Sequence, residues 1–304
     1  MRFSNPNGAN GQPLRQVWRM LREPRTPWPR DVAVVSSHPA PLDDPAEIRL
    51  TFVGHSTFLI QSGAGNILTD PVFSERASPF TFMGPRRARV PGVKFDDLPE
   101  ISMVLLSHNH YDHCDLPTLR ALNTRFAPVF ITTLGNAALL RRHGITRVEE
   151  LDWWQDATTA AVPDTATPAQ HFSSRGPFDR NRTLWAGFVL RLGERTVYFA
   201  GDSGYGPHFS AIRQRLGPFD LSLLPIGAYE PRWFMRDVHM NPAEAVQAHL
   251  DFESHRSIGM HFGTFQLTPE GIDEPLRALA EARTRAGVPD AEFCTLEFGE
   301  STSV

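Results

Sequence analysis

The chain has 304 residues, of which 41% are hydrophobic, and a formal net charge of −4 at pH 7. This length and composition suit a globular protein of one large or two smaller domains, and the weak negative charge gives no basis for a nucleic-acid partner. Lys94 is the only lysine, which excludes a GxxxxGK phosphate-binding loop and leaves few options for Schiff-base chemistry.

Residues 1–47 are rich in Pro, Gly, Asn and Arg, and we expect an irregular N-terminal arm ahead of a main domain at 48–304. One short helix is predicted within the arm, from Leu14 to Arg22. Its apolar face is formed by Leu14, Val17, Trp18 and Leu21. We favour packing of this face on the main domain. The alternative is a basic amphipathic helix lying on a membrane surface.

Strand patterns become dense from residue 48 onward. Strands are predicted at 48–53, 57–61, 66–69 and 101–106 from their apolar runs and alternations. Residues 78–99 show no periodicity and predict a long loop, which in a compact domain is often functional.

Beyond residue 115, predicted strands and helices come in irregular blocks. Helices are predicted at 116–123, 135–143, 207–216, 241–252 (with Asn241 as N-cap) and 270–286. Strands are predicted at 128–132, 158–162, 167–171, 184–192, 196–200, 221–224, 256–260 and 292–296. The lack of regular alternation favours an α+β fold, with two mixed β-sheets packed face to face and helices outside.

The residues directly after the predicted strand 101–106 carry the strongest chemical signal. Residues 107–115 have the sequence Ser-His-Asn-His-Tyr-Asp-His-Cys-Asp. Imidazole and carboxylate groups are the usual ligands of zinc and similar divalent ions. In an extended chain His108 and His110 share a face and can bind one ion, and a following turn brings Asp112 and His113 toward a second. The spacing predicts two adjacent metal ions, and with them hydrolysis.

Three further candidate ligands each end an apolar segment: His171, Asp202 and His261. Side chains at strand ends lie on one rim of a sheet, where the rigid scaffold meets the loops. A single histidine in such a place is more often structural than a ligand. Several of them beside a dense His/Asp motif favour one shared centre.

The four candidate ligands of 108–113 and the three further ones, taken in chain order, resemble the full ligand set of the metallo-β-lactamase superfamily. The resemblance extends over residues 48–300. The resemblance implies an αββα sandwich with two zinc ions, or iron or manganese in their place. It implies that one ion is held by His108, His110 and His171. It implies that the other is held by Asp112, His113 and His261, with Asp202 bridging the two.

Several shorter stretches resemble the N-acyl-phosphatidylethanolamine-hydrolysing phospholipase D branch of that superfamily. They are 54–60, 69–71, 107–113, 168–172, 201–205 and 224–235, the last followed by His239. The sugar-lactonase branch shares the early Gly-His-Ser-Thr and Asp-Pro elements. The narrower resemblance implies a phospholipase D-type phosphodiesterase acting on (N-acyl)phosphatidylethanolamine-like lipids through a metal-bridging hydroxide.

Other residues near these motifs are assigned supporting roles. Asp112 and His239 are the candidate catalytic residues, with His239 donating a proton to the leaving alkoxide or binding the phosphate. Asp70 is expected to hold a ligand histidine in one tautomer, and His55 either does the same or supports a loop. The candidate substrate-binding residues are Arg175, Tyr229 and His239.

Two other functions are left open by the sequence. One is a hydrolase of soluble substrates, either a lactonase or a small phosphodiesterase, and the other is a non-catalytic metal-binding sensor. The expected partner is a phospholipid or other phosphodiester substrate, and peripheral membrane contact and a homo-oligomer are both left open. Two distant cysteines, no apolar run near 18 residues and no signal-peptide core favour the cytoplasm, with or without membrane contact.

Overall fold

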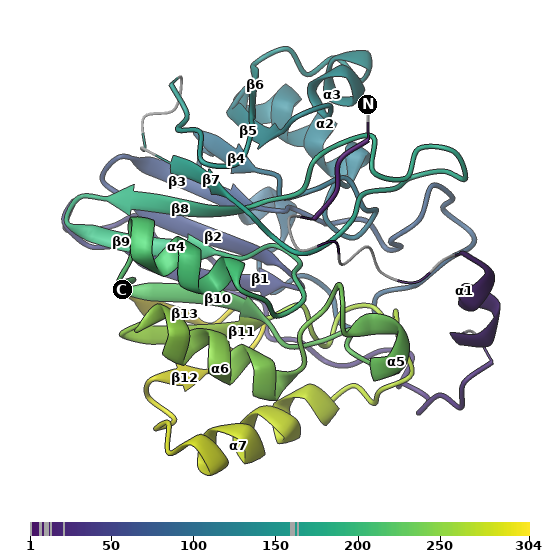
Figure 1. The fold of residues 1–304 in the computed structure, drawn as a ribbon. Helices are drawn as coiled ribbons and strands as arrows, with labels where there is room; N and C mark the ends of the chain where they lie inside the picture. Colours follow the sequence, from purple (N-terminus) through teal and green to yellow (C-terminus); the bar gives the residue numbers. More distant parts are fainter. Residues whose placement is uncertain are drawn as a thin grey trace.

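The computed structural model describes residues 2–5, 8, 12, 14–20, 22–158, 162 and 164–304. Two mixed β-sheets pack face to face, with helices on the outer sides (Figure 1). The strand order is β13-β1-β2-β3-β4-β5-β6 in one sheet and β12-β11-β10-β9-β8-β7 in the other. The α+β sandwich expected from the irregular blocks is confirmed.

The first sheet begins with antiparallel strands and continues with parallel ones. Its antiparallel part comprises β1 (Arg49–Gly54), β2 (Thr57–Ser62), β3 (Gly65–Thr69) and β13 (Ser301–Ser303). Its parallel part adds β4 (Met103–Leu105), β5 (Val129–Thr133) and β6 (Val148–Leu151) beside β3. Parallel neighbours need crossover connections. The long segment 70–102 connects β3 to β4, α2 (Leu116–Phe126) lies between β4 and β5, and α3 (Ala137–Arg142) lies between β5 and β6.

The second sheet has the same division. Its antiparallel part comprises β7 (Asp164–Thr167), β8 (Gly187–Leu192) and β9 (Arg195–Phe199). Its parallel part comprises β10 (Leu221–Pro225), β11 (Arg256–Met260) and β12 (Phe293–Cys294). The connecting helices are α4 (His208–Leu216), the short α5 (Arg232–Met235), α6 (Pro242–Phe252) and α7 (Glu274–Ala286). Asn241 caps α6 in a capping box with Glu244, as its sequence predicts.

The main core fills the space between the two sheets. From the first sheet it takes alternate residues such as Phe52 and Phe58, which point to one face. From the second sheet it takes Phe188 and Phe199 but also Tyr198, because the cluster continues on the outer face of that sheet to α4 and α6. A separate cluster joins the outer face of the first sheet to α2 and α3, through side chains such as Leu119 and Leu140. Each sheet is thus anchored on both faces, which fixes the strand ends where the candidate ligands lie.

Some predicted elements differ from the structure. The strand at 167–171 instead occupies 164–167, and Pro168 cannot donate a ladder hydrogen bond beyond it. The strand at 158–162 is wrong at its described ends, Thr158 and Val162, while 159–161 lie outside the described residues. Helix α7 begins at Glu274 rather than at residue 270. Strands β6 and β13, helix α5 and a 3-10 turn at Phe95–Asp97 were not predicted.

The N-terminal arm contains α1 (Leu14–Met20), within the predicted helix. Residue Leu21 and the side chains of Leu14 and Trp18 lie outside the described part of the chain. Within the described residues, no helix has the length and apolar character needed to span a bilayer.

Candidate metal centre

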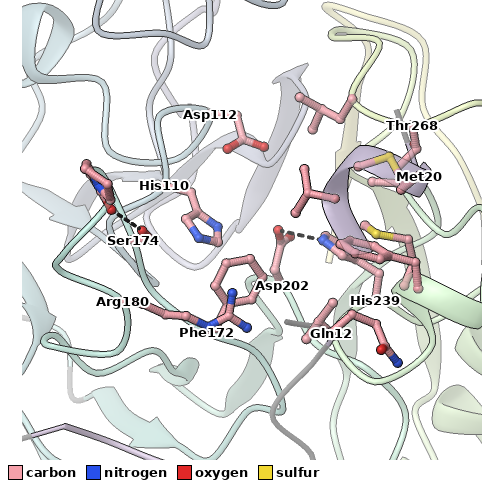
Figure 2. Close-up of a pocket in the computed structure, with 18 residues that line it drawn as sticks. Gln12, Met20, His110, Asp112, Phe172, Ser174, Arg180, Asp202, His239 and Thr268 are labelled. Carbon is pink, nitrogen blue, oxygen red and sulfur yellow. Dashed lines mark hydrogen bonds and ion pairs between the residues drawn. The ribbon is translucent and has the colours of Figure 1, made fainter. Parts of the chain in front are cut away.

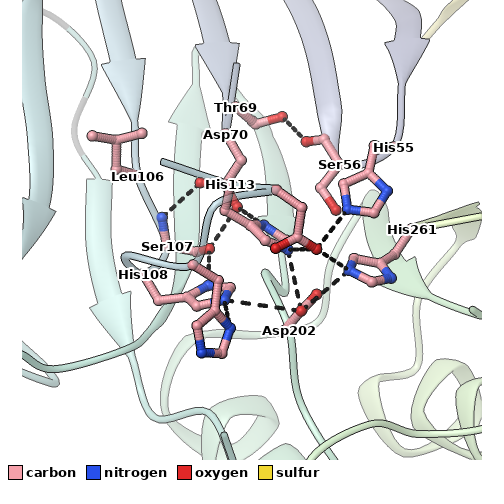
Figure 3. A network of polar contacts seen from close by, with 12 residues as sticks. His55, Ser56, Thr69, Asp70, Leu106, Ser107, His108, His113, Asp202 and His261 are labelled. Carbon is pink, nitrogen blue, oxygen red and sulfur yellow. Dashed lines mark hydrogen bonds and ion pairs between the residues drawn. The ribbon is translucent and has the colours of Figure 1, made fainter. Parts of the chain in front are cut away.

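The seven predicted ligands converge at the ends of strands of the two sheets. Figure 3 shows four of them, His108, His113, Asp202 and His261, gathered together. The 108–113 motif follows β4, and His171, Asp202 and His261 follow β7, β9 and β11 respectively. Their side chains are buried, apart from the partly buried His110. The structure therefore brings together every residue of the predicted ligand set.

One group of donors consists of His108, His110 and His171. His110 Nδ1 lies 2.9 Å from His108 Nε2 and 3.2 Å from His171 Nε2. The outer nitrogens are held by the protein: His108 Nδ1 lies 2.8 Å from Ser107 Oγ, and His171 Nδ1 lies 2.8 Å from the Val238 carbonyl oxygen. This outer hydrogen bonding fixes the ring orientation of metal-binding histidines and leaves the inner nitrogen to face an ion.

A second group consists of Asp112, His113 and His261, joined by His55. Asp112 Oδ2 lies 3.5 Å from His113 Nε2, 3.4 Å from His261 Nε2 and 3.0 Å from His55 Nε2. The sequence placed His55 behind a ligand histidine or in support of a loop, whereas in the structure its Nε2 contacts the Asp112 carboxylate. It lies close enough to count among the donors as well.

Asp202 lies between the two groups. Its Oδ2 is 3.1 Å from His113 Nε2 and 3.2 Å from His261 Nε2 on one side. On the other side the same atom is 3.7 Å from His171 Nε2 and 3.9 Å from His108 Nε2. Asp202 Oδ1 is buried without a hydrogen-bond partner. This is the position that a bridging carboxylate requires.

The electrostatics of the centre favour bound cations. Burial opposes ionisation of Asp202, yet neighbouring His113 and His261 hold the pKa of its carboxyl well below the ordinary value. The same carboxylate raises the pKa of His261 to about 9 against the effect of burial. Burial and neighbouring histidines lower the pKa of His110 to about 3, so that its ring is neutral and able to coordinate an ion. The Asp202 carboxylate attracts positive charge, and a neutral imidazole beside it can act as a ligand. The site therefore suits divalent metal ions.

Asp70 supports the centre from behind. Its carboxylate lies 2.6 Å from His113 Nδ1 and accepts a 2.7 Å hydrogen bond from the Ser107 amide. This contact fixes the His113 tautomer with Nε2 toward the centre, where Nε2 is buried without a partner. Asp70, His55 and His261 have φ values of 34°, 58° and 62°, left-handed conformations that are strained for such residues and persist where surrounding structure holds them.

A cavity of about 310 Å³ opens directly over the donors (Figure 2). Its floor contains His110, Asp112, Asp202 and His239. His239 Nε2 lies 3.8 Å from Asp202 Oδ2, and His239 Nδ1 is buried without a partner. The walls are largely apolar, and their apolar members are Val17, Met20, Phe172, Pro177, Ala228, Phe234, Met235, Val238 and Leu267.

The N-terminal arm supplies part of this cavity. Val17 and Met20 of α1 line it opposite the donors. The arm is fastened to Trp233 of α5: the Arg19 guanidinium lies 4.3 Å from the Trp233 ring centre, and Glu23 accepts a 3.1 Å hydrogen bond from its indole N–H. Of the described side chains of this helix, Val17 and Met20 thus line the cavity over the centre, and packing of its whole apolar face on the main domain stays a prediction.

Two predicted substrate residues are not brought to this cavity. The Arg175 guanidinium donates to the Asn109 and Cys114 carbonyls at 2.7 and 2.8 Å, and so clamps the metal-binding loop. Tyr229 is buried outside the lining, and its neighbour Ala228 lies at the wall instead. Arg180 was missed by sequence reasoning. It lines the cavity with its guanidinium 4.4 Å from the Phe172 ring centre, and its only sequence signal was proximity to His171.

The comparisons agree with this geometry. A family model described as the beta-lactamase superfamily domain matches residues 65–262. An uncharacterized protein of Mycobacterium tuberculosis is 40% identical over 271 residues, 88% of this chain and 72% of that protein. N-acyl-phosphatidylethanolamine-hydrolyzing phospholipase D 1 of Caenorhabditis elegans is 38% identical over 263 residues, 82% and 74% of the two chains. The metallo hydrolase Igni18 of Ignicoccus hospitalis shares the fold, with a TM-score of 0.63 at 21% identity over 85% of this chain and 98% of that one.

Proposed function

Because the chain belongs to the metallo-β-lactamase superfamily, in its N-acyl-phosphatidylethanolamine-hydrolysing phospholipase D branch, and is a metal-dependent hydrolase, we propose that it is a binuclear zinc phosphodiesterase. The proposed substrates are (N-acyl)phosphatidylethanolamine-like lipids. The observation that carries this proposal is a single cavity with ionisable donors on its floor and apolar side chains on its walls. Such a cavity suits a molecule with a phosphodiester at one end and acyl chains at the other.

The residues present fit two metal ions. His108, His110 and His171 would hold one ion, Asp112, His113 and His261 would hold the other, and Asp202 would contact both. When bound, two zinc ions lower the pKa of a water molecule and neutralise charge that builds on a phosphodiester. Asp202 Oδ1, which is buried without a hydrogen-bond partner, would be satisfied by a metal ion in this assignment.

Two side chains on the cavity surface are suited to bind the phosphodiester itself. His239 lies beside Asp202 on the floor, and its unpartnered Nδ1 can take part in a hydrogen bond with a substrate oxygen. Arg180 is the one lysine or arginine among the described residues that line the cavity. Its planar guanidinium can bind two phosphate oxygens at once. Together they would orient the reacting bond over the metal ligands.

The apolar roof would receive the acyl part of the substrate. Val17 and Met20 of α1 line the cavity together with Phe234 and Met235 of α5. Each buried methylene of a lipid chain contributes roughly 0.8 kcal/mol. A soluble substrate without acyl chains would gain nothing from this surface, so the roof favours the lipid over a small phosphodiester.

Exposed apolar loop tips beside the cavity suit peripheral contact with a bilayer. Phe82, Met83 and Phe178 are 77%, 55% and 81% exposed. Their loops and α1 project from the same side of the molecule in Figure 1. Solvent-exposed clusters of large apolar side chains mark surfaces that bind partners or membranes. We propose that these tips insert at the lipid surface and bring the cavity to its substrate.

The test is a product assay on the zinc-loaded protein. Vesicles containing N-acylated or plain phosphatidylethanolamine are expected to release phosphatidic acid, and metal analysis is expected to give about two zinc ions per chain. Turnover of bis-p-nitrophenyl phosphate with neither lipid cleaved would establish the soluble-substrate hydrolase instead. No turnover of any of the three by the metal-loaded protein would favour a sensor.

A further inference from the structure

A second cavity of about 310 Å³ lies on a different part of the molecule. It shares no lining residue with the cavity over the metal centre. Its walls come from three segments: the loop after β6, the residues between β7 and His171, and the start of α4. The lining residues are Trp153, Trp154, Pro168, Ala169, Gln170, Pro207, His208 and Ala211.

Two adjacent tryptophans form one wall and are only partly buried. Trp153 is fixed by a 2.7 Å hydrogen bond from its indole N–H to the Trp185 carbonyl. Trp154 has a φ of 71°, a left-handed conformation that a bulky residue rarely adopts. Its amide donates to the Ala166 carbonyl at 2.7 Å, which holds the strained backbone in place. Strain of this kind is an indication of function, because it persists where the side chain must occupy a set position.

The wall formed by α4 is also held by hydrogen bonds. His208 Nε2 lies 3.0 Å from Ser203 Oγ, which also accepts a 2.9 Å hydrogen bond from the Gln170 backbone amide. Residues 208, 211 and 215 follow one face of α4 at helical spacing. Arg215 does not line the cavity, but its guanidinium lies 4.7 Å from the ring centre of Trp154, which does. The cavity therefore has flat aromatic surface, and a cation contacts one of the two tryptophans that form it.

We propose that this cavity is a binding site for a planar aromatic carboxylate of about two fused rings. The ring system would pack against Trp153 and Trp154, and the carboxylate would pair with Arg215. Offset or edge-on contact between aromatic rings is favourable beyond simple burial. A cavity already held open by hydrogen bonds needs little ordering when a ligand enters.

The experiment measures binding of 2-naphthoate to the full zinc-loaded chain by calorimetry, together with quenching of tryptophan fluorescence. Ala211→Trp fills the cavity from the exposed surface of α4, and Gln214→Trp, exposed on the same helix but outside the lining, is its matched control. We expect Ala211→Trp to weaken binding at least tenfold and Gln214→Trp to leave it unchanged. Arg215→Gln is expected to weaken 2-naphthoate binding about twofold to fivefold without affecting neutral 2-naphthalenemethanol.

Three outcomes would overturn the site. In the first, Ala211→Trp leaves naphthoate binding intact, as it would for a carboxylate bound at the metal centre. In the second, the Gln214→Trp control loses naphthoate affinity as much as Ala211→Trp does. In the third, decanoate binds as tightly as naphthoate. The last would assign the cavity to acyl chains rather than to aromatic rings. Because the measurement needs no turnover, its failure leaves the proposed phosphodiesterase untouched, and failure of that activity leaves this site untouched.

Discussion

The floor and the roof of the cavity over the metal centre are built in opposite ways. The floor is a set of buried ionisable groups at strand ends, and Asp202 there lies within 4 Å of five histidines. The roof consists of apolar side chains of α1, fastened to α5 through Trp233. Under the proposed function, chemistry would reside in the floor and substrate selection in the roof, so substitutions in one part should spare the property of the other.

The largest expected effect comes from the floor. His108→Ala removes a donor that no neighbour can replace, and we expect turnover of both lipid and bis-p-nitrophenyl phosphate to fall on the order of 10³-fold. The measurement is kcat/KM for both substrates, together with bound zinc. His255→Ala, at an exposed position, is the matched control. Substantial activity toward either substrate in the His108 variant would refute the role of this floor.

A smaller loss of zinc affinity or activity is expected from Asp70, which supports a metal ligand from behind. Asp70→Asn keeps the shape of the side chain but weakens its hold on His113, and zinc affinity or activity should fall between about 10- and 100-fold. Asp115→Asn is the control, since the Asp115 carboxylate is also buried but binds the Phe73 and Ser74 amides instead. It should lower the thermal midpoint without changing zinc affinity. Equal zinc affinities in the two variants would contradict the assignment of Asp70.

The same contrast explains what the sequence could predict. The floor was predictable because four of its donors lie within residues 108–113 and the other three end apolar segments. A local sequence pattern is therefore enough to predict the metal ligands. The roof was not, because α1 meets Trp233 more than 200 residues away, and no periodicity encodes that contact. The extra strand β6 was missed for a related reason: its four residues include Glu149 and Glu150, and only pairing with β5 makes them a strand.

The roof should change affinity for the acyl chain and little else. Met20→Ala removes apolar surface from the cavity, and the KM for detergent-dispersed lipid should rise about fivefold to tenfold, because roughly one to two methylene contacts are lost. The kinetics of bis-p-nitrophenyl phosphate should stay the same. With dispersed substrate, Met83→Ala is the matched control, since Met83 is exposed and lies outside the cavity. A parallel loss for both substrates would show that α1 supports the floor as well, and the division would fail.

The smallest effect is expected at the loop tips beyond the roof. Phe82→Ser removes one exposed aromatic ring, and partitioning onto phosphatidylethanolamine vesicles should weaken about threefold, since a single ring inserts only part of its apolar surface. Vesicle sedimentation measures this, and Val35→Ser, at an even more exposed position in the N-terminal arm, is the control. Activity on detergent-dispersed lipid should be unchanged, because Phe82 does not line the cavity. If the Val35 variant lost vesicle binding equally, the contact with lipid would be spread over the surface, and the tips would have no special part in delivering substrate to the roof.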